Sequence, residues 1–340
     1  MKLIKTEDAV GHVLCHDITQ IIKGVTKDAV FRKGHIVTEE DIPVLLSVGK
    51  ENLYVWENDE NMLHENEAAQ ILYDISADSN MHGSDIKEGK IELIADIDGV
   101  LMIDRDKLRS INSLGQMMIA GRHSGFPVKK GDKLAGTRVI PLVIEKQKME
   151  QAKAIGGDSP IFSLKPYILK TVGVVTTGSE VFKNRIEDTF TPVIVDKLAE
   201  YGMEMTMHAI CSDDHEDITR EINKMLEAGV DMVICTGGMS VDPDDKTPLA
   251  IKNAGTDIVT YGAPVLPGAM FLLSYKGETP VIGLPGCVMY AKRTIFDLVL
   301  PRMAAGIRLT KQDIDCLGEG GLCLSCPECV YPNCGFGKGM

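Results

Sequence analysis

From Leu169 onward, the chain alternates short apolar runs with helix-like stretches, and this pattern limits the fold more than any other feature. The runs KTVGVVTT, DMVICT and TPVIGL are continuously apolar or small, as in strands that are buried on both faces. The stretches between them, such as HEDITREINKMLEAG, have helical spacing and end at glycine. We therefore predict an α/β fold: a three-layer parallel sheet with a mixed edge, covered by helices and preceded by smaller α+β and β-rich N-terminal domains.

The chain has 340 residues, which is more than one hydrophobic core usually holds. Changes in pattern divide it into a small α+β unit over 1–60, a middle α+β or β-rich region over 61–155, the α/β domain over 166–310 and a Cys-rich tail over 311–340. The GGDSP stretch after the middle region is typical of a hinge. In the α/β domain we expect a helix over 191–202 capped by Thr191, and a long helix over 288–306.

The balance of charges excludes two classes of partner. The formal net charge is -13, which argues against non-specific binding to nucleic acid or to an anionic membrane. No apolar run is long enough to cross a bilayer, and the N-terminal MKLIKTEDAVGHVL lacks the features of a signal peptide. We expect a cytoplasmic protein.

The chemistry-bearing residues collect where the predicted strands end. In open α/β sheets, ligands bind beyond the carboxyl ends of the strands. Four such ends carry turns rich in glycine, hydroxyl or acidic residues: Thr177, Gly178, Ser179 and Glu180; Asp213 and Asp214; Thr236, Gly237, Gly238, Ser240, Asp242, Asp244 and Asp245; and Pro285 and Gly286. Glycine turns can present N–H groups to a phosphate, and Mg²⁺ can bridge that phosphate to carboxylates. The alternative is that these acids are solvated or cap helices, as Asp213 or Asp214 could do for a helix at His215.

These turns resemble those of the molybdopterin-binding domain family, which includes molybdopterin adenylyltransferases and molybdotransferases, gephyrin-like proteins among them. The resemblance rests on TTGSE, on TGG-M-S followed by an aspartate, on the Pro267–Gly268 turn and on GLPG, and it covers about residues 168–310. More loosely, RKGHIVTEEDIPVLLSVGKENLYV is similar to the stretch that precedes this domain in molybdotransferases. Such multidomain relatives dimerise, so the resemblance also implies a possible homodimer.

The resemblance implies a ligand and a set of roles. The ligand would be molybdopterin or its AMP adduct, with Mg²⁺ and molybdate taking part in the chemistry. Asp245, Asp213 and Asp188 match the family's acids and are the candidate catalytic residues, with Asp245 and Asp213 as Mg²⁺ ligands. The candidate cofactor-binding residues are Thr177, Gly178, Ser179, Glu180, Thr236, Gly237, Gly238, Ser240, Pro267, Gly268, Pro285 and Gly286. The implied function is a molybdotransferase-like step in molybdenum cofactor biosynthesis.

Two departures from the family pattern favour an alternative function. Molybdotransferases usually place lysines around the Pro-Gly turn, where this chain has Leu266 and Ala269, and their GLPGNPVS becomes GLPGCVMYAK. Lys292 or Arg293 could supply the missing positive charge. The alternative is a carrier or sensor that binds molybdopterin without turning it over and uses the tail to bind metal.

The tail concentrates cysteine. Cys323, Cys326, Cys329 and Cys334 follow the pattern C-x2-C-x2-C-x4-C. A reducing compartment disfavours disulfides, and this spacing lets several thiolates reach one metal centre. The pattern is close to bacterial ferredoxin spacing, which has x3 before its last cysteine. An Fe–S cluster, a Zn²⁺ ion held by four sulfurs and a tail without stable metal are the three alternatives. Because the segment has little apolar sequence, we expect it to be largely disordered without metal.

Overall fold

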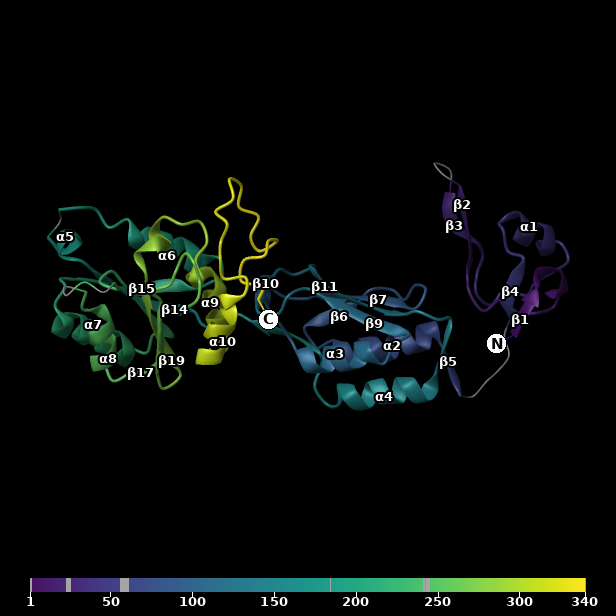
Figure 1. The fold of residues 1–340 in the computed structure, drawn as a ribbon, viewed down its shortest axis with the longest axis horizontal. Coiled ribbons are helices and arrows are strands. Elements are labelled where there is room, and N and C mark those ends of the chain that lie inside the picture. The colour runs from purple at the N-terminus through teal and green to yellow at the C-terminus, as the bar shows by residue number, and fades with distance from the viewer. Residues whose placement is uncertain are drawn as a thin grey trace. The chain divides into compact units, whose positions relative to one another are not determined.

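The structure is a computed structural model that describes residues 2–22, 26–55, 61–183, 185–240, 242 and 245–339. The chain forms two compact units, and each is described by itself (Figure 1). The first unit comprises the residues up to Ile94, Asp104–Gly121 and Lys133–Ile161, and the second comprises Ala95–Ile103, Arg122–Asp132 and the chain from Phe162 onward. The finer division into 1–60, 61–155, 166–310 and 311–340 stays a prediction.

The first unit begins with short antiparallel pairs. Strand β1 (Lys2–Lys5) pairs with β4 (Asn52–Val55), and β2 (Ile18–Ile22) pairs with β3 (Thr26–Phe31). Between them lie the 3-10 helix η1 (Thr6–Asp8) and α1 (Asp41–Ser47). A small core holds this part together, formed by Ala9, Leu14, Ile18, Val37, Leu45 and Leu53.

The rest of the first unit is a four-stranded antiparallel sheet with helices. Its strand order is β6-β7-β11-β9, and Figure 1 shows α2, α3 and α4 on one side of it. The strands are β6 (Met81–Gly83), β7 (Lys90–Ala95), β9 (Met117–Gly121) and β11 (Lys133–Val139). The helices are α2 (Glu65–Ser76), α3 (Arg105–Ser113) and α4 (Lys146–Gly156), and β5 (Met62–His64) pairs with β12 (Val143–Glu145).

The second unit is built on a six-stranded sheet in the order β15-β14-β16-β19-β18-β17. The first four strands are parallel, β18 runs antiparallel to both of its neighbours, β19 and β17, and the edge strand β17 therefore has the direction of the first four. This confirms the predicted α/β class with a mixed edge. The strands are β14 (Thr171–Thr177), β15 (Glu204–Cys211), β16 (Met232–Thr236), β17 (Asp257–Tyr261), β18 (Leu272–Lys276) and β19 (Thr279–Leu284).

Alternation along the strands explains the layers. Val172 and Val174 pack with α6 (Phe190–Ala199) and α9 (Ile295–Ala304). Val175, one residue out of phase, packs with α7 (His215–Glu227). Because successive side chains point to opposite faces, continuous apolar strands need helices on both sides (Figure 1). Helix α8 (Thr247–Asn253) joins α7 on its face.

Two expected helix boundaries are wrong. Helix α6 begins at Phe190 rather than at a Thr191 cap, because the Asp188 carboxylate accepts the N–H groups of Phe190 and Thr191 at 2.9 and 3.0 Å. The expected helix over 288–306 is two elements, a 3-10 turn η2 (Gly286–Met289) and α9 from Ile295. A capping box between Thr294 and Asp297 fixes the start of α9.

Smaller elements complete the second unit. Strands β8 (Gly99–Ile103), β10 (Phe126–Val128) and β13 (Phe162–Pro166) form a three-stranded sheet, and α5 (Ser179–Phe182), α10 (Lys311–Asp315) and η3 (Cys316–Gly318) are short helices. In the described parts of the chain, no helix is both long and apolar enough to span a membrane.

Candidate functional site

The topology brings the predicted turns to one edge of the six-stranded sheet. The carboxyl ends of β14, β15, β16 and β19 share this edge because the four strands are parallel. Strand β18 runs the opposite way, with Leu272 paired to Gly283 and to Tyr261. The Pro267–Gly268 turn before β18 and the end of β17 therefore lie at the same edge. We call this the carboxyl edge.

The turns after β14 and β16 touch each other. Gly237 has a φ of 83°, and a Cβ there would lie 2.3 Å from the Thr177 carbonyl oxygen. Glycine is required at this position both by its left-handed backbone and by this close approach. The Thr247 hydroxyl, at the start of α8, donates to the Gly237 carbonyl at 2.8 Å and shares a hydrogen bond with the Thr177 hydroxyl at 3.2 Å. A Cβ at Gly238 would lie 2.9 Å from the same Thr247 hydroxyl oxygen.

Asp213 joins the turn after β15 to the turn after β14. Its Oδ2 accepts the Ser179 N–H at 2.9 Å, at the point where Gly178 leads into α5 and Glu180 is exposed. The neighbouring Asp214 takes the other role considered from the sequence, because its Oδ1 accepts the first N–H groups of α7. Asp213 is thus half-buried and turned to the carboxyl edge, while Asp214 is a helix cap.

The Asp188 carboxylate caps α6, the helix that follows it. Besides the two N–H groups, its Oδ2 accepts the Thr191 hydroxyl at 2.6 Å, and His208 Nε2 lies 3.8 Å away. Burial raises the pKa of Asp188, but the hydrogen bonds from Thr191 and Phe190 outweigh it and leave the pKa below its ordinary value. Both carboxylate oxygens are therefore used in ordering the loop after β14.

Asp245 lies near the end of β17. It is half-buried, and its Oδ2 lies 3.3 Å from the Asp242 N–H that donates to it. Burial, and secondly the Asp245 charge, raise the pKa of Tyr261. The Tyr261 hydroxyl donates to the Met239 carbonyl at 2.9 Å, which ties the β16 turn containing exposed Ser240 to β17. Asp244, the third acid of this stretch, lies outside the described residues.

The two proline–glycine turns differ in their surroundings. A Cβ at Gly268 would meet Ile295 at 2.4 Å, and the Ile295 N–H donates to the Pro267 carbonyl at 3.2 Å, so this turn is packed on the start of α9. Gly286 is exposed, and a Cβ there meets nothing within 4 Å. Pro285 beside it is buried. The space beside Gly286 is open to a ligand.

One buried hydroxyl at the carboxyl edge has no hydrogen-bond partner in the part of the chain that the structure describes. Thr236, the last residue of β16, is fully buried, and within the described residues its Oγ1 makes no hydrogen bond. A buried polar group without a partner costs about 1–3 kcal/mol. A water, an ion or a ligand that binds at this strand end would satisfy the hydroxyl.

The described side chains do not form a complete metal centre. Among them, no three His, Cys, Asp or Glu residues are grouped so that they could hold one ion. Mg²⁺ does not need such a group, since it often takes one or two carboxylates together with phosphate oxygens and water. Asp245 and Asp213 suit that chemistry better than Asp188, whose oxygens are both engaged.

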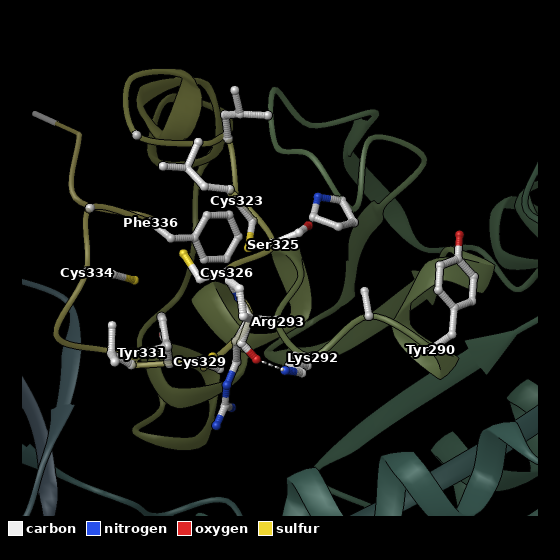
Figure 2. Close-up of a pocket in the computed structure, with 18 residues that line it drawn as sticks. Tyr290, Lys292, Arg293, Cys323, Ser325, Cys326, Cys329, Tyr331, Cys334 and Phe336 are labelled. Carbon is white, nitrogen blue, oxygen red and sulfur yellow. Dashed lines mark hydrogen bonds between the residues drawn. The ribbon is translucent and has the colours of Figure 1, made fainter.

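The four tail cysteines line one cavity of about 650 Å³. Pro267, Lys292 and Arg293 line it too, and Figure 2 shows these cysteines with Arg293 and Phe336. The tail is not the apolar-poor segment expected from the sequence: Ile314, Leu317 and Phe336 belong to the core of the second unit. All nine cysteines are free thiols.

The sequence reasoning missed three residues that organise the carboxyl edge: Thr247, Tyr261 and His208. Thr247 begins a helix directly before Pro248, and Tyr261 ends a strand before Gly262. These two positions in the sequence could have indicated that both residues lie at the carboxyl edge. His208 Nε2 lies 3.0 Å from the Thr176 hydroxyl, and its position in mid-strand gave no signal.

Comparison with known proteins assigns two segments. Residues 173–305 match a family described as "Probable molybdopterin binding domain", and residues 3–57 match a domain of unknown function, DUF8806. A CinA-like protein of Mycobacterium tuberculosis is 40% identical over 111 residues, which is 32% of this chain and 26% of the relative. A CinA-like protein of Mycobacterium avium is 37% identical over 75 residues, 22% of this chain and 17% of the relative. The chain thus spans about a quarter or less of these relatives.

Solved structures with similar folds have low similarity scores. The tungsten cofactor synthesizing protein MoaB from Pyrococcus furiosus has 19% identity and a TM-score of 0.31, covering 41% of this chain and 88% of its own. The protein CinA with unknown function from Thermoplasma acidophilum has 22% identity and a TM-score of 0.31, covering 35% and 89%. Both TM-scores are too low for these structures to support a statement about this chain.

The sheet topology and its helices define an α/β domain in the second unit. Within it, residues 173–305 are similar to the molybdopterin-binding domain family.

Proposed function

We propose that the carboxyl edge binds molybdopterin or its AMP adduct, and that the chain assists Mg²⁺-dependent molybdate insertion in molybdenum cofactor biosynthesis. The observation that carries the proposal is the convergence of the turns: Gly237 touches Thr177, and Asp213 holds Ser179. These contacts join the ends of three neighbouring strands into one surface. The family match over residues 173–305 supports a pterin as the ligand.

The proposal divides the work among the turns. The backbone around Gly237, Gly238 and Ser240 would bind the phosphate or pterin, and Asp245 would hold Mg²⁺ against the phosphate. Strand ends two strands apart are separated by about 10 Å, so Asp213, beyond β15, contributes mainly by ordering the turn at Ser179. Bound Mg²⁺ would stabilise charge that develops on the transferring phosphoryl group.

A larger side chain at the carboxyl edge tests whether the ligand binds there. Gly286→Leu places a side chain in open space without meeting protein atoms at Cβ, and it should weaken molybdopterin binding at least about tenfold. Gly136→Leu is the matched control, because Gly136 also has nothing within 4 Å and lies in β11 of the first unit. Calorimetric titration measures both variants against wild type. Equal affinity for wild type and Gly286→Leu, or no binding by wild type, would refute the proposal.

Turnover is tested separately. Asp245→Asn should retain the fold but lose Mg²⁺-dependent release of AMP from the adduct in a reconstituted assay. Asp257→Asn is the control, since Asp257 is an exposed acid at the amino end of β17, the opposite edge of the sheet. Asp245→Asn with wild-type AMP release would remove Asp245 from the proposal.

Two observations favour the alternative of a carrier or sensor that binds without turnover. Both oxygens of the Asp188 carboxylate already accept hydrogen bonds from Thr191 and Phe190, and Leu266 and Ala269 stand where molybdotransferases usually have lysines. Tight binding of the adduct by wild type with no AMP release would identify this function.

A further inference from the structure

We propose that Cys323, Cys326, Cys329 and Cys334 hold an iron–sulfur cluster in the cavity that they line. The cavity measures about 650 Å³ and is lined only by residues of the second unit. This proposal does not depend on the proposed pterin binding. It rests on how the tail is folded around the four cysteines.

The tail is a folded frame that carries the thiols. Cys323 and Cys334 are partly buried against the core of the second unit, and Cys326 and Cys329 are exposed. The Tyr331 hydroxyl donates to the Asp297 carbonyl at 3.0 Å. The first and last of the four thiols are therefore anchored to α9 and its surroundings.

A backbone hydrogen bond joins the two ends of the segment that carries the four cysteines. The Gly337 N–H donates to the Gly320 carbonyl at 2.9 Å, which joins the chain before the first cysteine to the chain after the last. Ser325, between Cys323 and Cys326, has a φ of 51°. A non-glycine residue in this left-handed region is uncommon, and strained backbone of this kind clusters at functional sites.

Positive charge lies beside the thiols. Lys292 and Arg293 both line the cavity, and the Lys292 Nζ donates to the Pro327 carbonyl at 3.0 Å, between Cys326 and Cys329 (Figure 2). The Arg293 guanidinium lies 4.9 Å from the Tyr331 ring centroid. Metal-bound cysteines are thiolates whose protons pass to solvent. The charge of Lys292 would offset part of the resulting negative charge, while Arg293 is already paired with Asp297.

The spacing of the cysteines favours a cluster over a single ion. Four sulfurs that bind Zn²⁺ must all lie about 2.3 Å from one point. A polynuclear iron–sulfur core instead lets each thiolate bind a different iron atom at the wall of a cavity. The x2, x2 spacing of the first three cysteines is that of bacterial ferredoxins.

The test is metal and sulfide analysis of the full chain, expressed and purified without oxygen. Iron and acid-labile sulfide should be present in equal amounts, with visible absorbance that dithionite bleaches. Cys326→Ser and Cys329→Ser should each lose most of the bound iron. Cys316→Ser is the matched control, because Cys316 is an exposed tail cysteine that does not line the cavity.

Circular dichroism and thermal unfolding of the variants identify any loss of iron caused by misfolding. Because the wild-type analysis needs no variant, it decides the metal by itself. Stoichiometric zinc without sulfide, or a chain without metal, would overturn the cluster. Wild-type iron content in both Cys326→Ser and Cys329→Ser, or equal loss in Cys316→Ser, would overturn the assignment to these thiols.

Discussion

The Cys323 N–H donates a hydrogen bond of 2.8 Å to the Leu266 carbonyl, and the Leu266 N–H donates one of 2.8 Å to the Gly321 carbonyl. Leu266 and Leu322 thereby form a parallel bridge. Leu266 directly precedes the Pro267–Gly268 turn at the carboxyl edge, so the first tail cysteine and a candidate pterin-binding turn share backbone hydrogen bonds. A change in the structure of the tail should therefore alter the stability of this turn.

Loading the cluster should slow hydrogen exchange of the Leu266 amide. Metal-bound Cys323 would hold the strand that accepts this N–H, so opening of the bridge becomes rarer. We expect exchange at least about tenfold slower in the iron-loaded chain than in Cys326→Ser. The amide of Ile234 in β16 is the internal control and should exchange equally in both. Equal Leu266 rates would show that tail and turn are uncoupled.

Replacing Thr236 by valine should stabilise the chain without ligand by about 1 kcal/mol, because it removes a buried hydroxyl that has no partner in the described residues. Thr247→Val is the matched control and should destabilise by about 1 kcal/mol, since its hydroxyl donates to Gly237 at 2.8 Å. Urea unfolding measures both changes. Equal destabilisation by the two variants would show that the Thr236 hydroxyl is satisfied.

Asp188→Asn should lower stability by about 1 kcal/mol at neutral pH, as expected for the loss of a carboxylate that accepts first-turn N–H groups. Since the folded pKa of Asp188 lies below its ordinary 3.8, the contribution is complete above the unfolded pKa and is lost as the pH falls through the folded pKa. The difference between wild type and variant should therefore shrink below about pH 4. Urea unfolding at pH 7 and in steps to pH 3 checks this. If the stability difference between wild type and Asp188→Asn grew as the pH fell, the predicted direction of the pH dependence would be wrong.

Asp297 joins α6 and α9 through a buried ion pair. Its Oδ1 lies 2.6 Å from the Lys197 Nζ and 2.8 Å from Arg293. Asp297→Ala leaves Lys197 buried without this partner and should cost about 3–5 kcal/mol of unfolding free energy. The control is Asp315→Ala, which breaks the exposed pair with Lys311 and should cost less than about 1 kcal/mol. Similar losses in the two variants would contradict the structural role of Asp297.

The α/β unit could be predicted from the sequence because its strands are buried on both faces and its helices end at glycine. The alternation of Val174 and Val175 between two helix layers is already present in the pattern. The start of α6 was misplaced because Thr191–Pro192 is a common helix opening. Sequence alone does not show that Asp188 reaches the N–H groups first.

The carboxyl edge was predicted more completely than its internal contacts. Parallel strands must end at one edge, so the sequence alone predicts that the turns at Thr177, Ser179 and Gly237 lie together. The bond from Ser179 to Asp213 and the tie from Tyr261 to Met239 depend on tertiary geometry. The packing of the tail was missed because Phe336 is a single aromatic residue in a glycine-rich segment.

The most direct test of the central claim is a crystal structure of the full chain with molybdopterin and Mg²⁺. We predict the ligand at the carboxyl edge, with its phosphate within hydrogen-bonding distance of the Gly237–Ser240 backbone and Mg²⁺ on Asp245. A pterin bound elsewhere, or an edge that stays empty while the ligand occupies another surface, would contradict the account.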